Sequence, residues 1–70
     1  MEETPDRRPQ VGDSVWCYRL NAWRDGRIER VGPVWVTASY GTRIGRVHRT
    51  KIRREALRAM PGGWQEWVTR

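Results

Sequence analysis

The residues best suited to chemistry in this chain are six cations that lie between positions 43 and 54. No acidic residue interrupts them, and their summed charge equals the formal net charge of +6 of the whole chain. Guanidinium groups bind phosphates in bidentate geometry, and release of counterions from neutralised phosphates favours binding to nucleic acid. Because like charges repel, such a concentration favours a polyanion-binding surface over a face that only keeps the protein solvated. These cations are Arg43, Arg46, Arg49, Lys51, Arg53 and Arg54.

Two aromatic residues just before this cluster extend the hypothesis. Trp35 and Tyr40 are candidates to stack on nucleic-acid bases. Single strands are commonly held by aromatic stacking together with cations on the phosphates, whereas duplex binding would rely mainly on the arginines. We therefore expect nucleic acid, DNA or RNA, as the partner. The choice between single and double strands stays open at this point.

Residues of the types that carry catalysis do not form a recognisable catalytic group in this sequence. His48 is the only histidine, and no serine or cysteine lies in a recognisable nucleophile motif. Asp13, Asp25 and Glu29 do not have the spacing of paired catalytic carboxylates or of metal ligands. We expect no enzymatic activity, no cofactor, no metal and no small-molecule substrate. Cys17 is read as a small core residue.

The length of the chain limits it to one small domain. A domain of 70 residues buries only about 60% of the surface that its unfolded chain exposes, so the core is small. A single cysteine excludes an internal disulfide. No apolar run approaches the length of a membrane span, and the acidic first residues do not resemble a signal peptide. We expect a soluble intracellular protein, in the cytoplasm or with the nucleoid or nucleus, and no membrane partner.

The pattern of β-branched residues predicts strands that position these groups. The stretch 24–40 contains two such runs separated by Gly32-Pro33, which is typical of a hairpin. Within it, Gly26 indicates a bulge or a close backbone approach. In the stretch 14–20 both faces are apolar, so the face that carries Trp16 is either covered or used for binding. The residues expected to face the core are Val15, Ile28, Val34, Val36 and Val47.

The second half of the chain is less regular. Residues 43–48 are predicted as a fourth strand, in which Ile44 and Val47 both point inward if Gly45 forms a bulge. From Arg49 onward, we favour a helical turn near Thr50, followed by a short strand or a helix of one to two turns.

The order of these signals resembles the Tudor branch of the SH3-like barrels, and much of it is shared with KOW modules and with the C-terminal DNA-binding domain of retroviral-type integrases. The resemblance implies a mainly β fold, a small five-stranded antiparallel barrel with a short C-terminal helical or irregular tail. We expect a flexible arm at residues 1–10, the barrel domain at 11–60 and a tryptophan-containing tail at 61–70. The motifs are Gly12-Asp13-x-Val15-x-Cys17, Trp23-x-x-Gly26-x-Ile28, Val34-x-Val36, Tyr40-Gly41, and Val47 followed by Ile52-Arg53.

The functional residues of Tudor readers match this chain poorly. Such readers hold a methylated cation in a cage of aromatic side chains. Of the cage positions, only Tyr40 is aromatic here; the others fall on Arg19, which has Tyr18 beside it, Arg24 and Thr37. Two arginines would repel a cationic ligand, so reading of methylated lysine or arginine is not expected.

An alternative hypothesis rests on the remaining tryptophans. Trp64 and Trp67 are three residues apart and would share one face of a helical turn. With Trp16 they form a surface that docks a protein partner or a second copy of the chain, or they fold back onto the barrel as additional core. The sequence does not decide between these alternatives.

Overall fold

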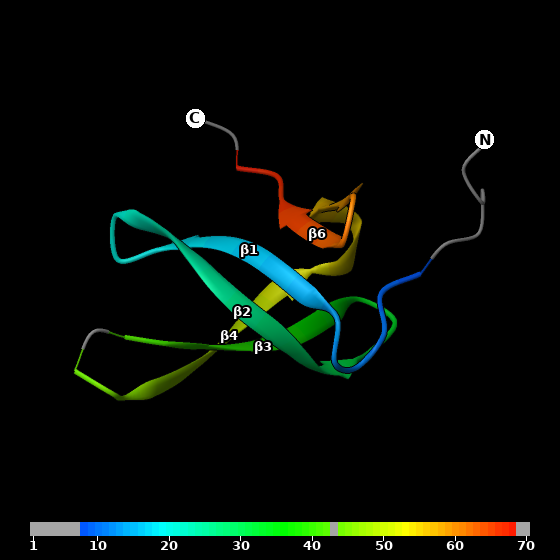
Figure 1. Cartoon of the computed structure of the whole chain (residues 1–70). Coiled ribbons are helices and arrows are strands. Elements are labelled where there is room, and N and C mark those ends of the chain that lie inside the picture. Colours follow the sequence, from blue (N-terminus) through cyan, green and yellow to red (C-terminus); the bar gives the residue numbers. More distant parts are fainter. Residues whose placement is uncertain (1–7, 43, 69–70) are drawn as a thin grey trace.

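The computed structural model describes residues 8–42 and 44–68, which form six strands and one short 3-10 turn (Figure 1). The elements are β1 (Ser14–Arg19), β2 (Ala22–Val31), β3 (Trp35–Gly41), β4 (Val47–Arg53), the turn η1 (Arg54–Ala56), β5 (Leu57–Met60) and β6 (Gly63–Glu66). No helix in these ranges is long and apolar enough to cross a membrane.

The strands form one mixed, open sheet in the order β4-β3-β2-β1-β6-β5. The mainly β class is confirmed. The five-stranded antiparallel barrel is not what forms, because a sixth strand is present, β6 pairs with β1 in parallel, and the outermost strands β4 and β5 do not pair to close the sheet. In Figure 1, β1 to β4 form a strongly twisted sheet, and the β5–β6 hairpin lies against β1.

Every strand contributes at least one residue to the core. Strand alternation places Val15 and Cys17 of β1 inward, and both are fully buried. Ile28 and Val31 of β2 are three apart and both face the core, because the pairing with β3 shifts register between Ile28 and Arg30. The buried cluster comprises Val15, Cys17, Ile28, Val36, Ala38, Tyr40, Ile52, Leu57 and Trp64.

Glycine positions explain two close strand contacts. A Cβ on Gly26 would lie 2.5 Å from the carbonyl oxygen of Ser39, so the predicted close backbone approach is confirmed, while the bulge lies at Glu29 instead. A Cβ on Gly63 would lie 2.5 Å from the carbonyl oxygen of Ser14. Gly63 therefore permits β6 to pair with β1.

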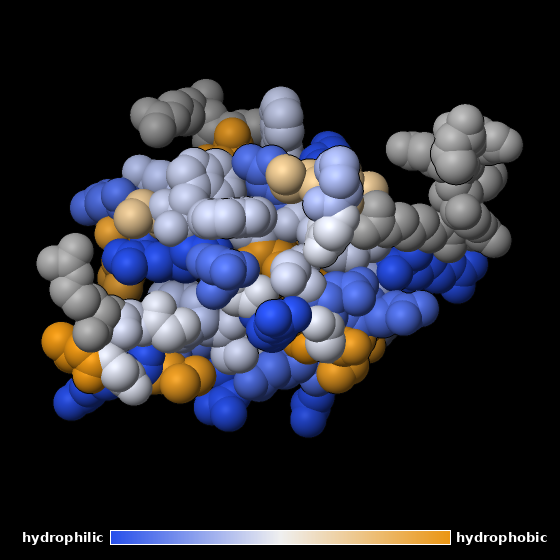
Figure 2. Space-filling model, in the orientation of Figure 1, coloured by the Kyte–Doolittle hydropathy of each residue, from blue (hydrophilic) through white to orange (hydrophobic). Residues whose placement is uncertain are grey.

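The predicted fourth strand is displaced by several residues. β4 begins at Val47, and residues 44–46 before it belong to the hairpin loop, in which Gly45 has a φ of 87°. Ile44 and Val47 are 78% and 64% exposed, so the expectation that both point inward was wrong. Figure 2 shows apolar colour at the tip of this hairpin, at lower left. Val34 was also misplaced, because it lies in the β2–β3 turn and is 49% exposed.

The C-terminal segment is sheet and not helix. Residues 63–66 form β6, and the helical turn lies at η1 instead of near Thr50. Trp64 is 5% exposed, and its indole Nε1 donates a hydrogen bond to Oδ2 of Asp13 at 3.0 Å. Trp64 therefore belongs to the core. The domain boundary predicted at residue 60 falls between β5 and β6, and these two strands pair with each other.

Arg19 connects the two sides of the open sheet. Its guanidinium Nη1 donates to Oε1 of Glu66 in β6 at 2.6 Å. Its Nε donates to Oγ1 of Thr50 in β4 at 2.7 Å. The side chains of Arg19 and Glu66 are both largely buried, with 25% and 14% of their surface accessible. The hydrogen bond that Arg19 donates to Glu66 raises the pKa of the Arg19 guanidinium above its usual value.

Candidate nucleic-acid interface

The outer faces of β2, β3 and β4 carry two rows of cations on either side of an uncharged row. Residues paired across neighbouring strands lie on the same face of a sheet. Arg27 of β2 pairs with Ser39 of β3, which pairs with Arg49 of β4. The uncharged row, here called the central lane, consists of Trp35, Thr37 and Ser39 on β3.

The next cross-strand positions repeat this arrangement. Arg30 of β2 pairs with Thr37, and Thr37 pairs with Lys51 of β4. Trp35 pairs with Arg53 of β4. Strands are spaced by about 5 Å, so the backbones that carry the two cation rows lie about 10 Å apart. Arg49, Lys51 and Arg53 are all exposed, as the strand period of two requires of alternate residues on a solvent-facing side.

The cations of this face differ in the hydrogen bonds and ion pairs that their side chains make. Arg49 Nε donates to Oε1 of Glu29 at 2.8 Å, and this hydrogen bond, with a smaller contribution from Ser39, lowers the pKa of Glu29. Arg30 and Lys51, by contrast, make no side-chain hydrogen bond or ion pair with the described part of the chain. These two exposed groups are available to an anionic ligand.

A groove opens beside Trp35. It has a volume of about 440 Å³ and is lined by the turn residues Gly32, Pro33 and Val34, by Trp35 and Thr37, and by the cations Arg30 and Lys51. Trp35 is 44% exposed, and the guanidinium carbon of Arg53 lies 5.0 Å from the centre of its ring. The arrangement combines an aromatic surface with positive charge.

Not every predicted residue belongs to this face. Arg46 is exposed in the β3–β4 loop, and Arg43 lies outside the described residues. Arg54 is half-buried, and its Nη1 donates to the carbonyl oxygen of Gly32 at 3.0 Å, so it fixes the β2–β3 turn. Tyr40 is 7% exposed in the core and stacks on His48, with ring centres 5.5 Å apart. Tyr40 is therefore not available to stack on a base, because it faces inward from β3.

Sequence reasoning missed Arg30. It precedes Val31, and a regular strand would place Arg30 on the same side as the core residue Ile28. The bulge at Glu29 turns it outward. The available signal was that Ile28 and Val31 are both apolar yet three residues apart, a spacing that a regular strand cannot bury on one face.

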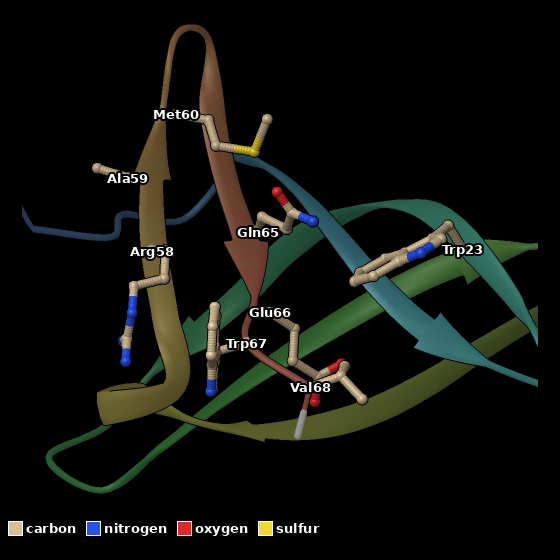
Figure 3. A pocket seen from close by; sticks show the side chains of 8 residues that line it. All are labelled: Trp23, Arg58, Ala59, Met60, Gln65, Glu66, Trp67 and Val68. Carbon is tan, nitrogen blue, oxygen red and sulfur yellow. The ribbon is translucent and has the colours of Figure 1, made fainter. Parts of the chain in front are cut away.

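A second surface with aromatic side chains lies on β1, β2, β5 and β6, and Figure 3 shows one of its hollows. Trp16 and Trp67 are 43% and 58% exposed, whereas the third predicted residue, Trp64, is buried. Trp23, which the sequence did not single out for this surface, is 41% exposed and packs edge-on against Tyr18, with ring centres 5.4 Å apart. The surface defined by Trp16, Trp23 and Trp67 is called the tryptophan face below.

Charged residues frame the tryptophan face at its two sides. The cross-strand register runs from Arg58 of β5 to Gln65 of β6, then to Trp16 of β1 and to Asp25 of β2. A cation therefore lies at one end of this row and an anion at the other. The guanidinium carbon of Arg58 also lies 5.6 Å from the ring centre of Trp67.

Residues 8–42 and 44–68 contain no group of three or more potential ligands that could hold a metal ion. Comparisons with known proteins return no matching family model, no matching curated protein and no matching solved structure. The functional interpretation therefore rests on the chemistry of the chain.

Proposed function

We propose that this protein is a non-enzymatic nucleic-acid-binding domain that uses the outer face of β2, β3 and β4. The observation that carries the proposal is the register that sets the central lane between two rows of cations. Arg30, Lys51 and Arg53 contact phosphates, and Trp35 offers a stacking surface. Arg46 in the adjacent loop extends the positive surface. An intracellular location, in the cytoplasm or with the nucleoid or nucleus, is part of the same proposal.

We also propose that the antiparallel meander β1–β4 is related to the Tudor- and KOW-type members of the SH3-like folds. Its support is the order of short strands and tight turns on which the resemblance rests. The β5–β6 hairpin, with its parallel pairing to β1, would be this chain's own addition. Function is inferred from the face and not from this relationship.

The test is a fluorescence anisotropy titration with short DNA and RNA at low ionic strength. The double variant Arg30→Glu with Lys51→Glu is compared with a matched control, Arg8→Glu with Arg58→Glu, which changes the net charge equally on exposed cations elsewhere. We expect the first variant to lose at least about tenfold in affinity, and the control to lose much less. Equal losses in both variants, or no binding by the wild-type protein, would overturn the proposal.

A second candidate function is self-association through the tryptophan face, and the row from Arg58 to Asp25 favours it. In a two-fold dimer with its axis along the strands, β5 of one copy lies opposite β2 of the other, so each Arg58 meets an Asp25. The exposed tryptophans between them supply the apolar centre that interfaces require.

A charge exchange tests this candidate directly. Asp25→Arg and Arg58→Asp should each weaken the dimer, and the double variant should restore it, as measured by sedimentation over a range of concentrations. A wild-type protein that stays monomeric, or a double variant no better than either single one, would exclude the two-fold arrangement.

A further inference from the structure

The groove beside Trp35 has the chemistry of a site for one unpaired nucleotide. We propose that it receives a base of a single strand, so that the protein selects single-stranded over duplex nucleic acid. The inference rests on the proposed function and adds to it the class of nucleic acid and the place where a base is held.

The two sides of Trp35 differ. On the β4 side, Arg53 pairs with Trp35 and its guanidinium lies 5.0 Å from the ring centre. On the β2 side, the backbone N–H of Gly32 donates to the carbonyl oxygen of Trp35 at 2.9 Å, and the turn residues that follow line the groove. The aromatic surface is thus supported by a cation on one side and adjoins the open groove on the other.

The groove offers contacts for each part of a nucleotide. Pro33 and Val34 provide apolar surface beside the indole, and Thr37 provides a hydroxyl group for the edge of a base. Arg30 and Lys51 flank Thr37 from the two cation rows, where phosphates on either side of the base would lie. A volume of about 440 Å³ leaves room for a base with its sugar.

Duplex nucleic acid cannot use this groove fully. Its bases are paired and stacked, so their faces are not accessible without the cost of unstacking. A duplex would contact the cations and leave Trp35 unused. Only an unpaired base obtains both the stacking and the phosphate contacts.

The experiment compares three probes of equal length at one low salt concentration: single-stranded oligothymidine, the same backbone with abasic positions, and a duplex. Wild-type protein should bind oligothymidine about tenfold more tightly than the abasic strand, which has the same phosphates but no bases. Trp35→Ala should lose this difference while keeping its affinity for the abasic strand and its salt dependence. Trp16→Ala, which removes an equally exposed tryptophan from the tryptophan face, should change neither the base preference nor the affinity for the abasic strand.

The outcomes distinguish a failure of the proposed nucleotide site from a failure of the proposed function. Equal wild-type affinity for oligothymidine, the abasic strand and the duplex would overturn the nucleotide site while leaving the proposed function intact. A base preference that survives Trp35→Ala would also overturn it. Absence of binding to all three probes would overturn the proposed function and this inference together.

Discussion

Arg19 is the residue whose role differs most from what its position in the sequence indicated. The resemblance to Tudor readers would place it at a position of the aromatic cage, but its guanidinium donates hydrogen bonds to Glu66 and Thr50. Its Nη2 also donates to the carbonyl oxygen of Lys51 at 3.2 Å. These bonds link β1 to the edge strand β4 and to β6, so Arg19 has a structural role in an open sheet.

Cys17 leads to a prediction about alkaline stability. Its side chain is fully buried, and burial raises the pKa of the thiol above the usual 9.0. Above about pH 9 the unfolded chain loses the thiol proton while the folded chain keeps it, so folding stability should fall as the pH rises, by at most about 1.4 kcal/mol per pH unit.

Urea unfolding at pH 7, 9 and 10 measures this effect when wild type is compared with Cys17→Ala. The variant is less stable overall because a buried group is removed, but it should lack this component of the pH dependence. Other groups titrate in both proteins and cancel in the difference. Identical pH profiles would show that Cys17 is not responsible.

At the level of elements, one inserted residue determines which side chains of β2 face the core and which lie beside the central lane. The bulge at Glu29 keeps Ile28 and Val31 in the core and turns Arg30 toward the central lane. The existence of β1, β2 and β3, the β2–β3 turn and the alternation in β1 were predictable because β-branched residues and Gly-Pro act locally. The start of β4 was not, because an apolar residue in a loop, such as Ile44, has the same local pattern as one in a strand.

The parallel pairing of β6 with β1 was beyond local sequence signals, and Gly63 provides a test of it. An added Cβ would lie 2.5 Å from the carbonyl oxygen of Ser14, so Gly63→Ala should destabilise the protein by about 2 kcal/mol or more in urea unfolding. The matched control is Gly62→Ala, where nothing lies within 4 Å of the added Cβ but φ is 86°. The control should cost about 1 kcal/mol from backbone strain alone. A Gly63→Ala variant as stable as the control would contradict the pairing.

At the scale of the whole molecule, the outer side of the sheet carries two kinds of surface. β4, together with Arg27 and Arg30 of β2, carries the cations around the central lane of β3, whereas Trp16 of β1, Trp23 of β2 and Trp67 after β6 form the tryptophan face. The sequence indicated the charge cluster and its stacking partner Trp35, because both are local features. It did not separate Tyr40 and Trp64 from the surface aromatics, because burial depends on strands that are distant in sequence.

The most direct test of the proposed nucleic-acid interface is a two-dimensional ¹⁵N–¹H NMR titration with a short single-stranded oligonucleotide at low salt. We expect the backbone amides of β3 and β4, and the indole signal of Trp35, to shift together as the ligand is added, and the shifts to reverse when salt is raised. The indole signals of Trp16, Trp23 and Trp67 should stay in place. Shifts confined to those three tryptophans, or no shifts in any residue, would contradict the central claim.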